Sequence, residues 1–424
     1  MLKGEVRIAS KLSVVLSVVF VVSLIFASVV PFVAASSFFY RTYEGMGSGE
    51  AFCVVQTSDG GYALVGFTQS RERAWLVKTD PDGNMEWNKT FEDGSANSIV
   101  QTGDGGYVLA GSTSSFGAGG SDFWLVKTDS VGNMEWNQTY GGSRDDSAKS
   151  MVQTSDWGYA IAGDTESYGV SFTDFLLVKT DSLGNMEWNK TYDAIKGRDY
   201  VRSFVQTSDG GYALIGETQS SVVEGYDCRL IKTDSFGNME WNKTYGEGGV
   251  HPNSIVQTSD SGYAIAGDKG AISDFGFFKT DSASNMEWNK TYGGLKSDYA
   301  CSVVQTSDGG YALAGAKEQT NMLYTTMWLI KTGSSGDMEW NRTYGYGCAN
   351  SVIQTSDGGY AMAGYKIEGF PTFCLVKTDE VGIIPEFPSL LLAIPLLVAL
   401  TLFLVLIRRR LLRNKFKNRR STHP

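Results

Sequence analysis

A repeat of about fifty residues constrains the fold of this chain more than any other feature. A Gln-Thr pair recurs seven times, at spacings of 45 to 53 residues. Each unit holds four short runs rich in β-branched and aromatic residues, separated by turns that contain glycine. Four strands in a repeat of this length are typical of a β-propeller blade. The pairs begin at Gln56, Gln101, Gln153, Gln206, Gln257, Gln305 and Gln354.

The fourth strand is missing from the last unit, and a matching segment stands before the first. The motif Met-Glu-Trp-Asn-x-Thr-(Tyr/Phe) occurs six times, whereas the seventh unit ends after Thr378 without it. The segment FYRTY at residues 39–43 matches the end of this motif. Pairing it with residues 373–378 closes a ring and removes two sheet edges, which an open β-solenoid would not need. The sequence therefore predicts an all-β fold, a seven-bladed β-propeller of four-stranded blades closed by the N-terminal strand 39–43.

The repeats resemble those of kelch-like and delta-60-type β-propellers. The strand Gly-Gly-Tyr-Ala-Leu-Ala-Gly, as at residues 309–315, carries this resemblance. The segment Asp-Ser-x-Gly-Asn-Met-Glu-Trp is also similar to the tryptophan-docking repeats of quinoprotein propellers. The likeness covers roughly residues 39–380 and implies the architecture alone, because propellers host many unrelated activities.

The N-terminal region combines basic residues with a long apolar run. Lys3, Arg7 and Lys11 precede an apolar run at residues 12–30, and the small residues Ala34, Ala35 and Ser36 follow. This order is typical of a secretory signal, although the run is long for one. Residues 1–35 are therefore predicted to be a signal peptide or an uncleaved N-terminal membrane anchor.

A second apolar run lies near the C-terminus, at residues 390–407, and eight basic residues follow it. It is long enough to cross a bilayer, and the positive-inside rule puts the basic tail, 408–424, in the cytoplasm. The propeller, 36–382, and a proline-containing linker, 383–389, are then extracellular. The segment IPEFPS at 384–389 resembles the PEF-type C-terminal sorting tail of archaeal surface proteins. This resemblance implies attachment to the cell membrane, although the long basic extension departs from the short family ending.

The chain between its two ends is strongly acidic. Residues 36–407 contain 25 Lys and Arg against 45 Asp and Glu, a net charge of −20. Such a surface repels nucleic acid, so the expected partner is an extracellular glycan, polymer or protein. The cysteines do not recur at one place in the repeats and are interpreted as small buried residues, with a Cys301–Cys348 disulfide as an alternative. They are Cys53, Cys228, Cys301, Cys348 and Cys374.

Residues for common catalytic chemistry are scarce. The histidines are His251 and His423, and no zinc-protease, paired-cysteine or P-loop motif occurs. Aspartates recur in the turns, where their carboxylates accept backbone N–H bonds. Residues 80–84 (DPDGN) resemble a fragment of a calcium loop without the spacing of an EF-hand. We therefore predict no catalytic residue, no metal site and no cofactor, with calcium at 80–84 as the alternative to a plain turn.

Two other recurrent residues have structural interpretations. The tryptophan of the fourth strand is predicted to fill the wedge between neighbouring sheets. A lysine near the end of the third strand lies opposite the glutamate of the Met-Glu-Trp motif across a hairpin turn, which predicts a cross-strand ion pair. These lysines are Lys78, Lys127, Lys179, Lys232, Lys279, Lys331 and Lys377.

The fourth strand also carries Asn-x-Thr sequons, so glycans could ring the outside of an extracellular propeller. The alternative is that Asn and Thr are simply the solvent side of a duplicated strand. The asparagines are Asn88, Asn137, Asn189, Asn242, Asn289 and Asn341.

The variable connections between strands are the predicted binding surface. The second-to-third and fourth-to-first connections vary widely and lie on one face of an up-and-down blade. The ligand-binding candidates on this face are Tyr168, Arg198, Tyr200, Tyr226, His251 and Tyr324. We expect a cell-surface binding or adhesion scaffold; a structural component of the envelope is the alternative. A propeller enzyme, such as a quinone-dependent oxidoreductase or polysaccharide lyase, is the third hypothesis.

Overall fold

The computed structural model describes residues 38–45, 47–68, 73–92, 94–170, 172–193, 197–219, 225–246, 250–269, 274–294, 296–318 and 324–384. The regular elements in these ranges are all β-strands, which confirms the prediction of an all-β fold. Within these ranges there is no helix long and apolar enough to cross a membrane. The predicted segments at 1–35 and 390–407 lie outside the described residues. The strands belong to a compact unit that ends at Gly382.

The strands form consecutive four-stranded antiparallel sheets, which agrees with a propeller-like repeat. Sheet 1 contains β2 (Gly49–Gln56), β3 (Tyr62–Thr68), β4 (Arg73–Thr79) and β5 (Met85–Glu92). Sheet 2 contains β6 (Gly94–Gln101), β7 (Tyr107–Thr113), β8 (Asp122–Thr128) and β9 (Met134–Tyr140). Sheet 3 contains β10 (Asp146–Gln153), β11 (Tyr159–Thr165), β12 (Asp174–Thr180) and β13 (Met186–Tyr192).

Two further sheets repeat this order. Sheet 4 contains β14 (Asp199–Gln206), β15 (Tyr212–Gln219), β16 (Tyr226–Thr233) and β17 (Met239–Tyr245). Sheet 5 contains β18 (Val250–Gln257), β19 (Tyr263–Lys269), β20 (Asp274–Thr280) and β21 (Met286–Tyr292).

The remaining strands form one seven-stranded sheet because its middle strand is long. Residues 338–346 of β25 (Met338–Gln354) pair with β24, and residues 347–354 pair with β26. We call its two halves sheet 6 and sheet 7. Sheet 6 contains β22 (Asp298–Gln305), β23 (Tyr311–Glu318), β24 (Thr325–Thr332) and the first part of β25. Sheet 7 contains the rest of β25, β26 (Tyr360–Glu368), β27 (Phe370–Thr378) and β1 (Phe39–Tyr43).

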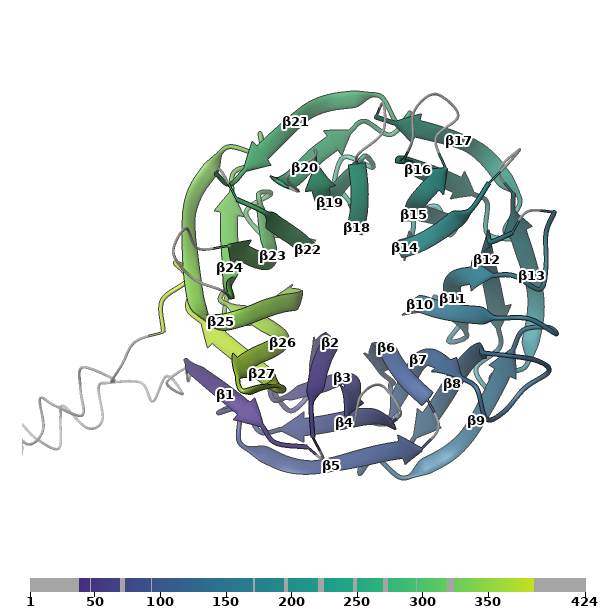
Figure 1. Cartoon of the computed structure of the whole chain (residues 1–424), viewed down its shortest axis with the longest axis horizontal. Coiled ribbons are helices and arrows are strands. Elements are labelled where there is room, and N and C mark those ends of the chain that lie inside the picture. Colours follow the sequence, from purple (N-terminus) through teal and green to yellow (C-terminus); the bar gives the residue numbers. More distant parts are fainter. Residues whose placement is uncertain are drawn as a thin grey trace, which may run out of the picture. The chain divides into compact units, whose positions relative to one another are not determined.

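The sheets stand side by side around a central opening (Figure 1). In each sheet the first strand is innermost (Figure 1). The Met-Glu-Trp strand is outermost in sheets 1 to 6, and β1 takes this place in sheet 7 (Figure 1). The third strands are buried between neighbouring sheets; β8 is buried along its whole length. A strand that is buried on both faces reads as a continuous apolar run, which explains the Phe-Trp-Leu-Val sequence of β8. The outermost β9, by contrast, is largely exposed.

The recurrent tryptophan packs against the next sheet, as predicted. The Trp87 ring lies 5.8 Å from that of Tyr107, which begins the second strand of the following sheet. The Trp–Tyr contact recurs between later sheets, at centroid distances of 5.7 to 6.3 Å. A tyrosine at the end of the outer strand also reaches the next sheet, as Tyr140 donates from its hydroxyl to the carbonyl of Gly184 at 2.6 Å.

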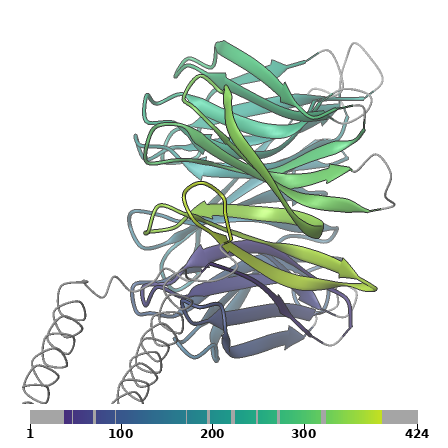
Figure 2. The ribbon, with the colours of Figure 1, turned by 90° about the vertical axis from the view of Figure 1, so that its left-hand side faces the viewer.

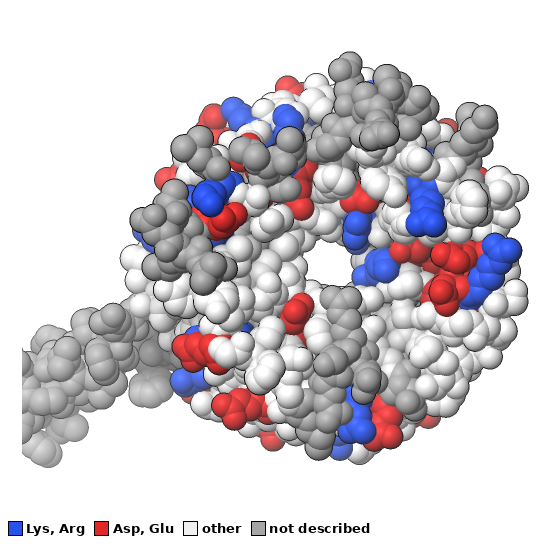
Figure 3. Space-filling view, in the orientation of Figure 1, with Lys and Arg blue, Asp and Glu red and all other residues white. Residues whose placement is uncertain are grey.

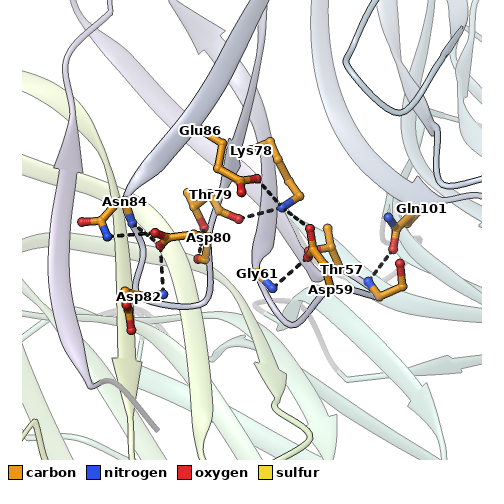
Figure 4. Close-up of polar contacts among 11 residues, drawn as sticks. Thr57, Asp59, Gly61, Lys78, Thr79, Asp80, Asp82, Asn84, Glu86 and Gln101 are labelled. Carbon is orange, nitrogen blue, oxygen red and sulfur yellow. Dashed lines mark hydrogen bonds and ion pairs between the residues drawn. The ribbon is translucent and has the colours of Figure 1, made fainter. Parts of the chain in front are cut away.

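The recurrent lysine forms the predicted ion pair and a second one. Lys78 is nearly buried, and its Nζ lies 2.8 Å from both Glu86 Oε2 and Asp59 Oδ2 (Figure 4). Asp59 also accepts hydrogen bonds from the Thr57 hydroxyl and the Gly61 amide, so it closes its turn as expected. The pairing with glutamate recurs through Lys127, Lys179, Lys232, Lys279 and Lys331. Lys377 pairs with Asp357.

The glutamine of the repeated Gln-Thr pair links neighbouring sheets. The Oε1 atom of Gln101 accepts a hydrogen bond from the Ser58 amide of the preceding sheet at 2.8 Å (Figure 4). Between the last sheet and the first, Gln56 Oε1 accepts from the Ser356 amide at 2.9 Å. The glutamine–serine hydrogen bond that joins sheet 1 to sheet 2 therefore also joins sheet 7 to sheet 1, which are far apart in the sequence.

The N-terminal strand pairs as the sequence predicts. The β1 strand is antiparallel to β27, with Phe39 opposite Lys377 and Tyr43 opposite Phe373. Phe39 contacts Tyr62 of sheet 1 at a centroid distance of 6.1 Å, and the Tyr43 hydroxyl donates to the carbonyl of Gly83 at 2.9 Å. These contacts repeat those of the Trp and Tyr side chains on the other outer strands. Figure 2 shows the yellow-green strands of sheet 7 beside the purple strands of sheet 1.

Candidate functional site

A cavity of about 550 Å³ lies at the central opening, where the first and second strands of several sheets meet. This volume is typical of a small-molecule site. Its lining residues come from the first half of the first strands and the last half of the second strands, so they lie nearer to the variable connections than to the constant turns. In Figure 3 charged side chains gather on the side of the opening where β10 and β14 lie.

A β-bulge in every first strand supplies seven residues of this lining. The pairing of each first strand with its second strand shifts once, and the shift skips one residue of the first strand. The skipped residue follows Ala, Val or Pro and precedes Ser or Cys, and it has no partner in the second strand. Bulges re-aim side chains and often occur beside binding sites. The bulge residues are Phe52, Asn97, Lys149, Arg202, Asn253, Cys301 and Asn350.

Three of the bulge residues hold neighbouring first strands together. The Nδ2 atom of Asn97 donates to the carbonyl of Ala148 in the next sheet at 2.7 Å. Asn253 makes the same contact with Ala300, and Asn350 makes it with Ala51. These side chains therefore order the pocket wall as well as lining it.

One wall of the pocket carries paired charges from sheets 3 and 4. Lys149 Nζ lies 3.3 Å from Asp164 Oδ2, and the Arg202 guanidinium lies 3.1 Å from Glu217 Oε1. The side chain of Arg202 is 42% exposed whereas that of Glu217 is 5% exposed, so the cation faces the opening and the carboxylate supports it from behind. His251 Nδ1 shares the same Glu217 oxygen at 2.9 Å. The wall therefore presents the donors of Lys149 and Arg202 already paired with the carboxylates of Asp164 and Glu217.

The buried carboxylates of this wall have raised pKa values. Burial raises the pKa of Asp164, against the opposing charge of Lys149. Burial also raises the pKa of Asp268 to about 6, although its carboxylate accepts a hydrogen bond from the Ala300 amide. Perturbed carboxyl groups gather at functional sites more often than elsewhere.

The opposite wall is largely uncharged and comes from sheets 1, 6 and 7. It presents the rings of Phe52, Tyr299 and Tyr365. The thiols of Cys301 and Cys348 also lie here, with their sulfur atoms 3.5 Å apart. An apolar, aromatic wall facing cationic donors suits a ligand with a flat or ring-shaped body and an acidic group.

The structure brings some of the predicted binding residues together. The rings of Tyr200 and Tyr226 lie 5.9 Å apart, and Arg198 lies over the ring of Phe172 at 6.0 Å. The hydroxyl of Tyr168 donates to the carbonyl of Gly141, and the ring of Tyr324 lies 6.2 Å from that of Tyr346. These residues contact neighbouring connections and strands on the same side of the ring: Tyr168 reaches the β9–β10 connection, and Arg198 reaches the β11–β12 connection.

His251 is the predicted residue whose side chain is tied to the charged wall, through Glu217. Sequence reasoning missed the rest of this wall: Lys149, Asp164, Arg202, Glu217 and Asp268. A signal was present in the repeats, because the residue after the Gly of the second strand is acidic in three successive units. That position holds Asp164, Glu217 and Asp268, against Phe67, Ser112, Ala316 and Tyr365 in the other units.

The sequon asparagines and the calcium-loop fragment were also singled out from sequence. All six sequon asparagines lie exposed on outer strands, so their glycosylation stays a prediction that the geometry permits. In the fragment at 80–84, Asp80 Oδ1 accepts hydrogen bonds from the amides of Asp82 and Asn84 (Figure 4). These hydrogen bonds close a turn at 80–84, and calcium binding there stays an untested alternative.

Comparison with known proteins identifies no family. The sequence matches no family model and no curated protein. Among solved structures, a protein of unknown function from Bacteroides caccae is 12% identical, with a TM-score of 0.45 over 70% of this chain and 94% of its own. A protein of unknown function from Dyadobacter fermentans is 11% identical, with a TM-score of 0.48 over 80% and 98%. Sqt1 from Chaetomium thermophilum is 9% identical, with a TM-score of 0.45 over 81% and 98%. No function is carried over from these likenesses.

Proposed function

We propose that this chain is a closed, seven-bladed β-propeller of the kelch-like type that is held at the cell surface and binds a ligand on one face. The contacts between sheets 7 and 1 support closure, since Gln56, Asn350 and Phe39 repeat contacts found between consecutive sheets. The apolar C-terminal run and its basic tail support attachment to the membrane, with the propeller outside. The PEF-type segment supports an archaeal surface protein.

The ligand that fits the central pocket best is an acidic saccharide. The observation that carries this proposal is the pairing of two walls: cationic side chains on Lys149 and Arg202, and aromatic rings on Phe52, Tyr299 and Tyr365. A carboxylate or sulfate accepts charge-assisted hydrogen bonds from the first wall, and a sugar ring packs against the second. Because the rest of the surface is acidic, the pocket attracts such a ligand only at short range.

The test compares acidic with neutral oligosaccharides in binding to the full-length protein by isothermal titration calorimetry. We expect uronic-acid oligosaccharides to bind and neutral ones of the same length to bind at least about tenfold more weakly, since a charge-assisted hydrogen bond contributes about 1.5–3 kcal/mol. Arg202→Gln should weaken acidic binding by a similar factor. The matched control is Lys89→Gln, because Lys89 lies on the outer strand β5 and contacts Asn133.

Two outcomes would contradict the proposal. Equal binding of acidic and neutral saccharides would remove the role of the cationic wall. If no saccharide binds and the protein instead associates laterally with itself, a structural role in the cell envelope replaces the binding role.

A further inference from the structure

Pairs of buried aspartates lie at junctions between neighbouring sheets. Asp122 begins β8 of sheet 2, Asp146 begins β10 of sheet 3, and their exposed fractions are 1% and 0%. Both carboxylates approach Gly141: a Cβ there would overlap Asp122 Oδ1 and lie 2.7 Å from Asp146 Oδ2. Two acidic groups therefore share one small, water-excluded place.

Each carboxylate of this pair is only half satisfied. The Oδ2 atom of Asp122 accepts from the Ala118 amide at 2.9 Å, and Asp146 Oδ2 accepts from the Gly142 amide at 2.8 Å. The Oδ1 atoms of both residues are buried and have no hydrogen-bond partner among the described residues. Burial and the charge of Asp146 both raise the pKa of Asp122. A buried, unpaired carboxylate costs several kcal/mol, so the arrangement calls for a positive counterpart.

The pair recurs between sheets 5 and 6. Asp274 begins β20, Asp298 begins β22, and both approach Gly293. The Oδ1 atom of Asp274 is buried and has no hydrogen-bond partner in the described part of the chain. Burial raises the pKa of Asp298, and the charge of Asp274 adds to this, whereas the hydrogen bond from the Glu318 amide and the charge of Lys317 oppose it.

The junction between sheets 3 and 4 shows what the other two junctions lack. Here the corresponding residues are Asp174 and Asp199, and the chain itself supplies a cation. Arg229 Nη1 donates to Asp199 Oδ2 at 2.7 Å and to the Tyr192 carbonyl, and Nη2 donates to the Asp193 carbonyl. The residues that correspond to Arg229 at the other two junctions are Leu176 and Trp328, by the strand registers. Neither side chain carries a charge, although Lys317 lies over the Trp328 ring at 4.3 Å and its charge acts on Asp298.

The repeats also link the two acidic positions in the sequence. Three sheets have no aspartate at the third-strand position that Asp122 holds in sheet 2, and the first strand of the sheet that follows each of them begins with glycine. The pairs are Arg73 with Gly94, Thr326 with Gly347 and Thr372 with Gly49. Four sheets do have an aspartate at this third-strand position, and in three of these cases the first strand of the following sheet also begins with aspartate. The exception is Asp227, which is followed by Val250. Two like charges that occur together repel one another unless a cation or a proton lies between them.

We propose that Ca²⁺ binds between Asp122 and Asp146, and that a second Ca²⁺ binds between Asp274 and Asp298. Calcium takes six to eight oxygen ligands and accepts backbone carbonyls and water among them. The described residues contain no group of three or more metal-ligating side chains, so two carboxylates are the side-chain ligands of each site. Backbone carbonyls near Gly141 or Gly293, together with water, supply the remaining ligands. The ion joins neighbouring sheets as Arg229 does between sheets 3 and 4.

The test measures calcium stoichiometry on the full-length protein, purified in a mild detergent and freed of metal with a chelator. Equilibrium dialysis with Ca²⁺ should give two ions per chain, and calcium should raise the melting temperature because it binds the native state. Asp146→Asn and Asp298→Asn should each lose one ion. Asp82→Asn is the control: Asp82 is an exposed acidic residue in the turn at 80–84, and its substitution should lose none.

A gain of binding provides a second measurement. Arg229→Leu, which copies Leu176 of sheet 3, should leave Asp174 and Asp199 able to take a third ion. Terbium is a luminescent substitute for calcium and should give tyrosine-sensitised emission through Tyr168, because the Tyr168 hydroxyl contacts the Gly141 carbonyl. Asp146→Asn should lose this part of the emission. Circular dichroism confirms that each variant is folded.

Three results would overturn the proposal. The first is that the wild-type protein binds no calcium or terbium. The second is unchanged stoichiometry in both aspartate variants, or loss of an ion in Asp82→Asn. The third is that Asp146→Asn stabilises the protein while calcium has no effect, which would mean that a shared proton separates the two carboxylates.

Discussion

Replacing Phe39 with alanine should destabilise the whole propeller-like unit, although the residue stands in its first strand. Phe39 is 5% exposed and packs edge-on against Tyr62 of sheet 1, where the other outer strands place a tryptophan. It also lies against Gly83, so its ring fills the wedge between sheets 7 and 1. Truncating it leaves a cavity at the point where the two ends of the repeat array meet.

The magnitude follows from the burial of this ring. A buried Phe→Ala substitution costs about 3–5 kcal/mol of unfolding free energy, from lost transfer energy and the cavity that remains. In a unit of this size that loss lowers the melting temperature by about 4–7 °C. Urea unfolding of the full-length protein, followed by tryptophan fluorescence, measures the free energy directly.

The control is Thr42→Ala, because Thr42 lies on the same strand and is exposed. It should change the unfolding free energy by less than about 0.5 kcal/mol. If Phe39→Ala unfolds at the same urea concentration as the wild-type protein and Thr42→Ala, then β1 does not stabilise the array and the reasoning about closure fails.

Three other predictions concern single sites. Because the pKa of Asp268 is raised to about 6, its ionisation destabilises the fold as pH rises from 4 to 7. Asp268→Asn should therefore be more stable than the wild-type protein by up to about 3 kcal/mol at pH 7, with no difference at pH 4. Urea unfolding at each pH measures this difference. Oxidised glutathione should take two electrons from Cys301 and Cys348, form one disulfide and reduce the titratable thiols from five to three, whereas an unchanged count would contradict the 3.5 Å approach. Native protein should carry glycan at Asn137, lost in Asn137→Gln, by mass spectrometry of its peptides; an unmodified peptide would favour the plain-strand interpretation.

The strand order could be predicted because local chemistry repeats. The same turns and strand sequences recur in each unit, and the FYRTY segment at 39–43 matches the missing outer strand closely enough to place β1 beside β27. The lysine–glutamate ion pairs were predicted from the spacing about the hairpin turn, but the structure places Lys78 opposite Trp87 and leaves Glu86 at a β-bulge, from which its carboxylate reaches the lysine.

The charged wall of the pocket could not be predicted as a site. Lys149 and Arg202 lie at bulges, and their carboxylate partners come from the neighbouring strand, so their meeting depends on the exact register of each sheet. A shift of one residue turns a side chain to the other face. The candidate residues predicted on the variable face contact neighbouring connections and strands rather than the charged wall, apart from His251.

The sequence by itself determined the all-β class, the four-stranded unit and the displaced strand, because spacing, turn residues and strand periodicity are local properties. Only the tertiary structure decided which side chains share the central pocket and which aspartates meet between sheets. Asp122 and Asp146 are ordinary strand-start residues in the sequence. They become a buried pair of carboxylates because the packing of one sheet against the next removes water from around both side chains. The burial of their charge therefore depends on that packing rather than on either residue alone.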